Sequence, residues 1–563
     1  MRAARLFASS SILFFALTAG CGSPDGPGLS EAQQGVTTKV PTSRAELFRS
    51  DALYTVVVRG LDPRQTSVPA LQALRARADR DPSVKDYVDS AGAGSLELYA
   101  TDSRAVACDA APLTAEARFF ATASFGFGVK GNKSVTQPKP PHRLRFRAKN
   151  ERLFGLKSVD LNAMYNDPSH MREAMVWRML GEAGQASSRT AYAKLCVENG
   201  GALEYRGLFL LVERVDDVFL EDRFPARAKG NLYDVAVPNA SVGATLERRE
   251  GGPAAYARLF PLSDGRLPEA TYTLDTNNED DDPAELKTYG DLAAFIDTLN
   301  GETPALSNLG EGRFASDAYA RELDAIFNTR GFLRWAAINT LAGSWDNYLC
   351  TPGNYRLYNA GRGDTGDFMK APYFYWVPWD YDNSLGVNYF AGADWATVPL
   401  LRPWEACGPY WQSVGGGPTP APVPVLLANM LQNPTYRGYY LAFVEHALAT
   451  WFHADWVAQR VGPDTVAGDS AAGLWSILRP SVYGETLGAG TEAPFTQRLW
   501  TNDEIFRHLF RSERLQRPSE GRDVQSLTNF MNRRATRARE ELAGLPPPPA
   551  VDFRSVRVEA PPR

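Results

Sequence analysis

The residues of this 563-residue chain best suited to chemistry are oxygen-bearing side chains that follow strand-like segments. The apolar run YFYWVP leads directly into WDYDNS, which contains Asp380 and Asp382. Asp346 and Asn354 lie just before and at the start of the preceding strand-like segment. If the two segments pair as an antiparallel hairpin, their open ends meet. We therefore expect these four side chains to share one pocket.

Two interpretations of these four residues are open. Carboxylate and amide oxygens at one strand end suit Mg²⁺, because the ion keeps several waters and takes few protein carboxylates together with substrate phosphates. A further carboxylate beside the metal can accept a hydroxyl proton. The same residue types also form turns and cap strands. The choice lies between a phosphoryl-transfer site and a structural turn.

The elements that must position these residues are interleaved strands and helices, which predicts an α+β fold with a mixed or antiparallel sheet. The pattern becomes mostly helical towards the C-terminus. The expected strands are 52–59, 95–101, 117–129, 144–146, 191–197, 205–215, 354–359 and 373–380. The expected helices are 68–80, 168–180 and 284–299, followed by a mostly helical segment over 317–344.

Changes in composition divide the chain into six parts. They are a signal peptide (1–20), a flexible linker (21–44), a core region (45–414), a Pro/Gly linker (415–425), a helical C-terminal region (426–545) and a proline-rich tail (546–563).

The first twenty residues predict export. Arg2 and Arg5 precede an apolar run that is too short to span a bilayer. Small residues directly before Cys21 are similar to the bacterial lipobox, which implies that Cys21 is lipidated after cleavage. We expect a protein anchored by lipid to the cell envelope of a bacterium, at the outer membrane or the cell surface. Secretion with an unmodified Cys21 is the alternative.

Charge bears on the possible partners of the protein, and the cysteine content bears on its disulfides and metal sites. Sixty basic and 65 acidic side chains leave a net charge of -5, so we expect no nucleic-acid partner. Four cysteines follow Cys21, and export permits disulfides in any of three pairings. The sequence contains no CxxC or HExxH motif, so we expect no zinc site.

A set of short motifs runs in order from about residue 125 to residue 386. The motifs are GNKS (131–134), PK (138–139), RLRF (143–146), LKSVDLN (156–162), DPS (167–169) with RE (172–173), YRGLF (205–209) with Glu213, GNLY (230–233), Asp346 with NY (354–355), and PWDYD (378–382) with Gly386. Together they resemble the CotH (spore-coat protein H) kinase family. The resemblance implies an atypical, exported protein kinase with a reduced kinase-like fold, which uses ATP and Mg²⁺ or Mn²⁺ to phosphorylate Ser or Thr of surface or secreted proteins.

The resemblance also implies roles for the acidic residues. Asp346 would orient and deprotonate the acceptor hydroxyl. Asn354 and Asp380 would hold the metal that bridges the phosphates. Asp382 would be a second metal ligand or a structural partner of the following turn.

The remaining candidates are expected to contact the nucleotide. Lys139 or Arg143 would supply positive charge to the phosphates, and Glu213 would orient that cation. Trp376 lies near the aspartates and would stack on the adenine, with core packing of the strand as the alternative. The expected partners are thus ATP, a surface or secreted protein, and a membrane through the lipid anchor alone.

Three features leave other interpretations open. Pro140 and Asp234 stand where the family commonly has lysines, so a pseudokinase or a surface binding protein with the same fold is the alternative function. The segment 126–131 fits GxGxxG, which indicates either a glycine-rich strand bend or a loop that covers phosphates.

Overall fold

The structure is a computed structural model and describes most of the chain from residue 38 to residue 558. Within that range, the residues left undescribed are 91, 101–107, 109–112, 239–242, 363–366, 391, 414–421, 464–472, 486–498, 518–520 and 555. The predicted signal peptide, Cys21 and part of the predicted Pro/Gly linker lie outside the described residues.

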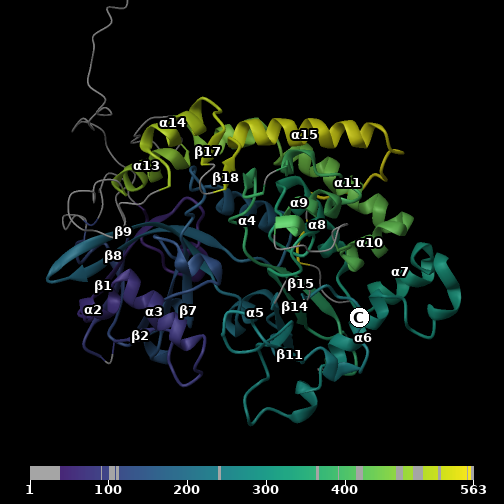
Figure 1. Ribbon diagram of the computed structural model, residues 1–563, viewed down its shortest axis with the longest axis horizontal. Coiled ribbons are helices and arrows are strands. Elements are labelled where there is room, and N and C mark those ends of the chain that lie inside the picture. The colour runs from purple at the N-terminus through teal and green to yellow at the C-terminus, as the bar shows by residue number, and fades with distance from the viewer. Residues whose placement is uncertain are drawn as a thin grey trace, which may run out of the picture.

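The N-terminal half is built on a large sheet, drawn in purple and blue in Figure 1. In the described residues it has nine strands in the order β2-β5-β6-β7-β9-β8-β1-β3-β4, and all neighbours are antiparallel except β1 and β8. The strands are β1 (Leu53–Arg59), β2 (Val88–Asp89), β3 (Ser95–Ala100), β4 (Arg118–Thr122), β5 (Phe125–Val129), β6 (His142–Phe146), β7 (Ser158–Asn162), β8 (Thr190–Asn199) and β9 (Ala202–Glu213).

Central strand β9 shows why this sheet is buried on both faces. Its side chains alternate, so Leu208 and Leu210 enter one core while Phe209 and Leu211 enter another. The first core is shared with helices and with the C-terminal region, and the second is closed by the N-terminal segments. The sheet is therefore a wall between two cores.

A second, smaller sheet contains both strands of the predicted hairpin. Its order is β13-β10-β14-β15. The strands are β10 (Asn231–Val235), β13 (Tyr272–Leu274), β14 (Tyr355–Asn359) and β15 (Phe374–Pro378), and β11 (Leu259–Phe260) and β12 (Glu269–Ala270) form a separate pair. β14 and β15 pair antiparallel, so the predicted hairpin is confirmed.

Helices pack around and between the sheets. They are α1 (Arg44–Leu47), α2 (Pro63–Thr66), α3 (Val68–Ala78), α4 (Arg172–Glu182), α5 (Asp217–Arg223), α6 (Gly290–Leu299), α7 (Asp317–Asp324), α8 (Thr329–Ala342), α9 (Gly408–Ser413), α10 (Val425–Gln432), α11 (Pro434–Thr450), α12 (Ala454–Val461), α13 (Leu474–Gly484), α14 (Asn502–Phe510) and α15 (Leu527–Ala543). Helix α8 is buried along almost its whole length and packs against α4, α11 and β15. It ends at Gly343, whose φ of 55° turns the chain into the loop that carries Asp346.

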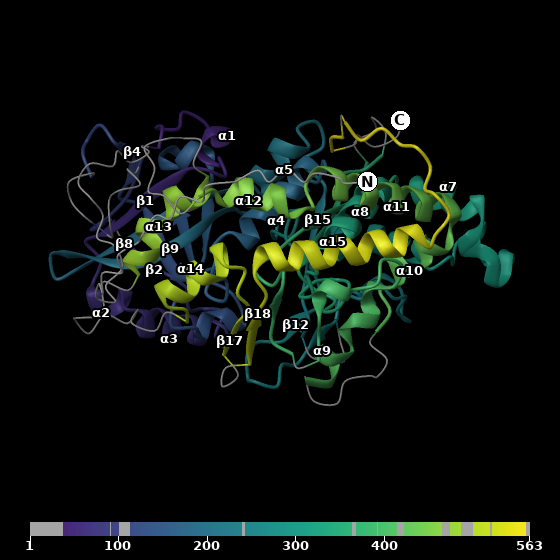
Figure 2. The same ribbon diagram turned by 90° about the horizontal axis from the view of Figure 1, so that it is seen from above.

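The C-terminal region folds back over the earlier parts. Helices α13 and α14 lie above the large sheet, and α15 runs along the top of the molecule in Figure 1, so that it crosses the middle of the view from above in Figure 2. A small sheet joins β16 (Val387–Asn388) to β18 (Arg522–Val524) and β17 (Leu515–Arg517). Side chains of α11, α13 and α15 belong to the same core as α4 and α8.

The α+β class is confirmed, and three predicted elements are corrected. The helix expected over 284–299 begins at Gly290, after a short 3₁₀ turn over Ala284–Lys287. The single strand expected over 117–129 is broken into β4 and β5, which lie at different places in the sheet. The helix expected from Pro168 begins at Arg172, because Asp167 first folds a turn and then accepts hydrogen bonds from the amides of Met171 and Arg172. No helix among the described residues is long and apolar enough to cross a membrane.

Candidate functional site

The open end of the β14–β15 hairpin carries the predicted acidic residues. Tyr355 lies opposite Pro378, so Asn354 and Asp380 continue from the paired strands at the same rim. The side-chain amide of Asn354 donates to the main-chain carbonyl of Asp346 over 2.7 Å. The hairpin register and this hydrogen bond bring the three predicted residues together.

The backbone at this rim is held in an uncommon conformation. Asn354 and Asp380 have φ of 54° and 58°, and Leu385 has φ of 53°. A left-handed residue other than glycine costs about 1–3 kcal/mol and persists only where its surroundings impose it. Such residues concentrate at functional sites, which supports a functional interpretation of the rim.

The carboxylates at the rim repel one another in a partly desolvated place. Burial, together with the charge of Asp380, raises the pKa of Asp346 to about 6. Burial and the neighbouring carboxylates raise the pKa of Asp382 well above its ordinary value. Two hydrogen bonds act to lower the pKa of Asp346. Thr351 donates to Oδ1 over 2.9 Å, and Asn383 donates to Oδ2 over 3.2 Å. A cation bound here would relieve the repulsion.

A lysine and a glutamate form the facing wall. Lys130 follows strand β5 and donates to Oδ1 of Asn162 over 2.7 Å. Asn162 in turn donates to Oε1 of Glu173, in the first turn of α4, over 2.6 Å. Burial, and then the charge of Asp380, raises the pKa of Glu173 to about 7. The wall and the acidic rim therefore lie within electrostatic reach of each other.

Arg143 reaches this wall through Asp160. Asp160 on β7 pairs with Lys130 at 3.1 Å and accepts two hydrogen bonds from Arg143, at 2.7 and 2.9 Å. Burial alone would raise the pKa of Asp160, but the two cations outweigh it and hold the pKa below its ordinary value. Arg143 is thus placed beside Lys130, as part of a cationic wall.

Two tryptophans of β15 and its extension have different surroundings. Trp376 is buried and stacks on Tyr355 with ring centroids 4.1 Å apart, so it packs in the core, as in the alternative interpretation. Trp379 is partly exposed, and both Lys130 and Arg356 approach its ring, at 5.3 and 4.7 Å. Trp379, and not Trp376, is thus the tryptophan of this strand that lies beside the cationic wall.

The expected pairing of Lys139 with Glu213 is wrong. Lys139 is buried and pairs with Glu485 over 2.6 Å, at the C-terminal end of α13. Glu213 pairs instead with Arg189 and Arg223, at 2.5 and 2.7 Å. Sequence analysis could not detect these pairs, because Glu485 lies 346 residues away from Lys139.

The donor atoms at the rim suit a hard cation, although they form no closed cage. Within the described ranges, no group of three or more His, Cys, Asp or Glu side chains is arranged to hold a metal ion. Asp380, Asp382 and Asn354 nevertheless offer two mutually repelling carboxylates and one amide oxygen. Mg²⁺ commonly binds with one or two protein carboxylates, waters and substrate phosphates. These residues fit such an ion.

A cavity of about 940 Å³ opens at the other end of the β14–β15 hairpin. It reaches from Arg214, after β9, across Gly230 and Asn277 to Gly361. Arg214 also acts electrostatically on Asp160, which places one edge of the cavity near the cationic wall. Five strand residues at about 3.3 Å each separate the cavity end from the acidic end by roughly 16 Å.

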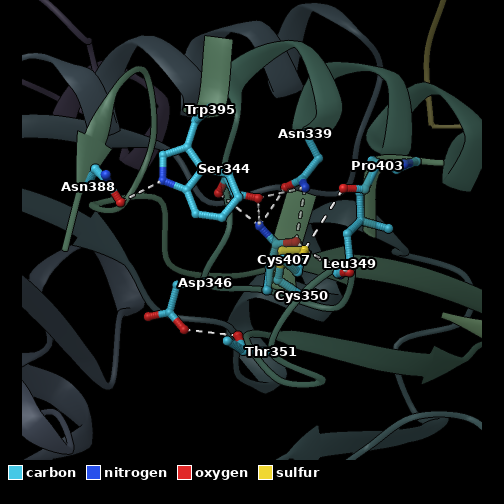
Figure 3. The surroundings of a disulfide bond; sticks show 11 residues. Asn339, Ser344, Asp346, Leu349, Cys350, Thr351, Asn388, Trp395, Pro403 and Cys407 are labelled. Atoms are coloured by element: carbon cyan, nitrogen blue, oxygen red, sulfur yellow. Dashed lines mark hydrogen bonds between the residues drawn. A yellow bond between two sulfur atoms is a disulfide. The ribbon is translucent and has the colours of Figure 1, made fainter. Parts of the chain in front are cut away.

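A disulfide fixes the loop that carries Asp346 (Figure 3). Cys350 is bonded to Cys407, and Cys108 is bonded to Cys196, which selects one of the three pairings left open by the sequence. Thr351, which donates to Asp346, directly follows Cys350 (Figure 3). The loop is thus covalently tied to a distant segment on one side of Asp346.

Two residues of the wall were not predicted from the sequence. Lys130 stands immediately after the glycine-rich strand, and Glu173 belongs to one of the motifs without having been given a role. The available signal was local: a lysine at a strand end and a glutamate in a first helical turn. Only the sheet order shows that Lys130 and Glu173 meet through Asn162.

A comparison of the whole sequence with known protein families agrees with this fold and site. The chain belongs to the CotH kinase protein family, whose model matches residues 127–462, more than half of its length. The resemblance drawn from the ordered motifs is therefore confirmed.

One curated relative is similar over a shorter stretch. The chain is 27% identical over 239 residues to "Inner spore coat protein H" of Bacillus subtilis (strain 168). The match covers 41% of this chain and 51% of the relative, so the chain spans about half the length of the curated relative it matches.

Proposed function

We propose that the protein is an atypical protein kinase that transfers the γ-phosphate of ATP to Ser or Thr of surface or secreted proteins. One observation carries the proposal: the Lys130–Asn162–Glu173 chain faces the Asp346, Asp380 and Asp382 carboxylates. Phosphoryl transfer requires cations for the phosphates, ligands for a metal and a base for the acceptor. Family membership supports the same activity.

Each side chain has a task in this reaction. Lys130 binds the phosphates, and Glu173 orients Lys130 through Asn162. Asp346 accepts the proton of the acceptor hydroxyl as that oxygen bonds to the γ-phosphorus and the bond to ADP breaks. Thr351 and Asn383 orient its carboxylate through their hydrogen bonds.

Asp380, Asp382 and Asn354 are the residues that would hold a divalent cation. A bound Mg²⁺ or Mn²⁺ would neutralise charge on the phosphates. The nucleoside would occupy the cavity between Arg214 and Gly361, whose Arg214 edge lies near the cationic wall.

A binding protein without turnover is the second candidate. It is favoured by the buried pairing of Lys139 with Glu485 and by Asp234, which pairs with Arg356 at 3.2 Å where the family commonly has a lysine. Such a protein would keep the nucleotide site without transferring phosphate. Kinase and binding protein differ in turnover.

The place of action is also a proposal. We propose that lipidation of Cys21 anchors the protein to the cell envelope, where surface proteins are its acceptors. A Cys21→Ser protein would then leave the membrane fraction, since buried acyl chains contribute about 0.8 kcal/mol per CH₂. Unchanged membrane association would contradict the anchor.

Two substitutions separate transfer from binding. Asp346→Ala should keep Mg²⁺-dependent ATP affinity while lowering turnover, because the base acts only on an acceptor. Asp380→Ala should weaken the metal-dependent ATP affinity itself. Calorimetric titration with ATP and Mg²⁺ measures the difference. Equal, negligible effects of both substitutions on binding and transfer would reject the site.

A further inference from the structure

A buried arginine connects the C-terminal segment to the loop that carries Asp380. Arg172, the first residue of α4, has no exposed surface, and Nε donates to the carbonyl of Leu385 over 3.1 Å. Nη2 donates to the carbonyl of Gln525 over 2.6 Å and lies 2.8 Å from Nε2 of His508. Arg172 thus joins three segments that are far apart in the sequence.

The direction of the His508 contact follows from its partners. The carbonyl of Glu513 lies 2.9 Å from Nδ1 and can only accept, so Nδ1 carries the hydrogen. Burial and the charge of Arg172 lower the pKa of His508 to about 3, which keeps the ring neutral. Nε2 therefore accepts from Arg172, and His508 completes the shell of the guanidinium.

Main-chain pairing holds the same loop from the C-terminal side. Strand β16, directly after the loop, pairs with β18, with Val387 opposite Val524. The amide of Gln525 donates to the carbonyl of Gly386 over 3.1 Å. The loop is therefore fixed by α14 and β18, which lie beyond residue 462, where the family match ends.

We propose that Arg172 is a positioning residue, through which the C-terminal segment sets the geometry of the Asp380–Gly386 loop. Its neighbour Glu173 faces Asp380, so the first turn of α4 contacts both the loop and the acidic rim. The inference rests on the proposed function in one respect: the loop carries the metal ligands.

Two matched pairs of substitutions test the connection without removing Arg172. His508→Leu removes the acceptor for Nη2, whereas His508→Gln offers a side-chain oxygen in its place. Gln525→Pro removes the amide that bonds Gly386, whereas Gln525→Ala keeps that amide and loses only the side chain. The His508 pair tests the contact with Arg172, and the Gln525 pair tests the main-chain bond between the same segment and the loop. If His508→Leu fails to fold, His508→Ala removes the same acceptor in its place.

The first measurement is amide hydrogen exchange of the peptide spanning residues 380–388 in the ligand-free protein. Exchange should be about 10-fold faster in the His508→Leu and Gln525→Pro proteins and close to the unsubstituted protein in their controls. Equal exchange in both members of each pair would overturn the proposal. This measurement needs no activity, so it stands even if the proposed function fails.

The second measurement is the Mn²⁺ concentration that gives half-maximal ATP binding. Loss of an orienting contact beyond the metal ligands should raise this concentration about 10-fold in His508→Leu and less than about 2-fold in His508→Gln. A purely structural role would lower thermal stability but leave this concentration unchanged. Absence of ATP binding by the unsubstituted protein would count against the proposed function, and exchange would still decide the role of Arg172.

Discussion

At the scale of single residues, the acidic rim was predictable, whereas only Arg143 of the cationic wall was predicted from the sequence. Asn354 precedes one strand of a local hairpin and Asp380 follows the other, so the pairing of these two strands was enough to bring them together. Lys130 and Glu173 meet only because β5, β6 and β7 lie side by side in the sheet. Lys139 was the wrong lysine, since a distant carboxylate neutralises it in the interior.

Replacing each lysine by methionine should separate the two roles. Lys130→Met should weaken ATP binding at a smaller cost in stability than Lys139→Met, because the buried Asp160 keeps its two hydrogen bonds from Arg143. Lys139→Met should cost about 3–5 kcal/mol of the free energy of unfolding, because it leaves Glu485 buried without its cation. Denaturant unfolding and ATP titration of both proteins measure the contrast. Loss of ATP binding by a fully folded Lys139→Met protein would contradict this assignment.

The proposed base also gives a pH dependence. Asp346 must be ionised to accept a proton, so turnover should rise with pH through its pKa of about 6. The Thr351 hydroxyl lowers that pKa, so Thr351→Val should move the rise to higher pH. Thr351→Ser keeps the hydroxyl and should not. Identical pH profiles of turnover for the valine and serine proteins would show that the hydroxyl does not tune the base.

At the scale of elements, local periodicity predicted most strands but not their places in the sheets. The hairpin of β8 and β9 was evident from its turn, whereas the parallel pairing of β1 with β8 depends on a contact across more than a hundred residues. The sequence left two roles open for the glycines of β5, a strand bend or a loop that covers phosphates. A Cβ on Gly126 would meet the ring of Tyr87, and one on Gly128 would lie 2.5 Å from the carbonyl of Asp86, so close packing explains both without a ligand.

Alanine at two glycines tests this explanation. Gly128→Ala should lower the free energy of unfolding by about 1–3 kcal/mol, because the backbone at Asp86 must move. Gly181→Ala, inside α4 with open space around its Cβ, should be neutral or stabilise by up to about 1 kcal/mol. Thermal unfolding compares the two proteins. Equal stability of both would mean that β5 does not need its glycine.

At the scale of the whole molecule, the C-terminal region is part of the same structure as the site. Helices α11 and α15 share a core with α8, and β18 pairs with β16 beside the Asp380 loop. The sequence predicted a separate helical region after a linker. Composition can locate such a boundary along the chain, but it does not show which earlier elements the region packs against. The loop that carries Asp380 is thus held in place by segments of the C-terminal region.

The central claim is phosphoryl transfer, and one measurement tests it most directly. The protein is incubated with γ-labelled ATP, Mg²⁺ or Mn²⁺ and a generic protein acceptor, beside an Asp380→Asn control that keeps size and polarity but loses the metal-binding charge. We predict metal-dependent label on Ser or Thr with the unsubstituted protein and a loss of about 100-fold or more with the control. Equal labelling by both proteins, or none by either while ATP still binds, would contradict the account and favour a binding protein.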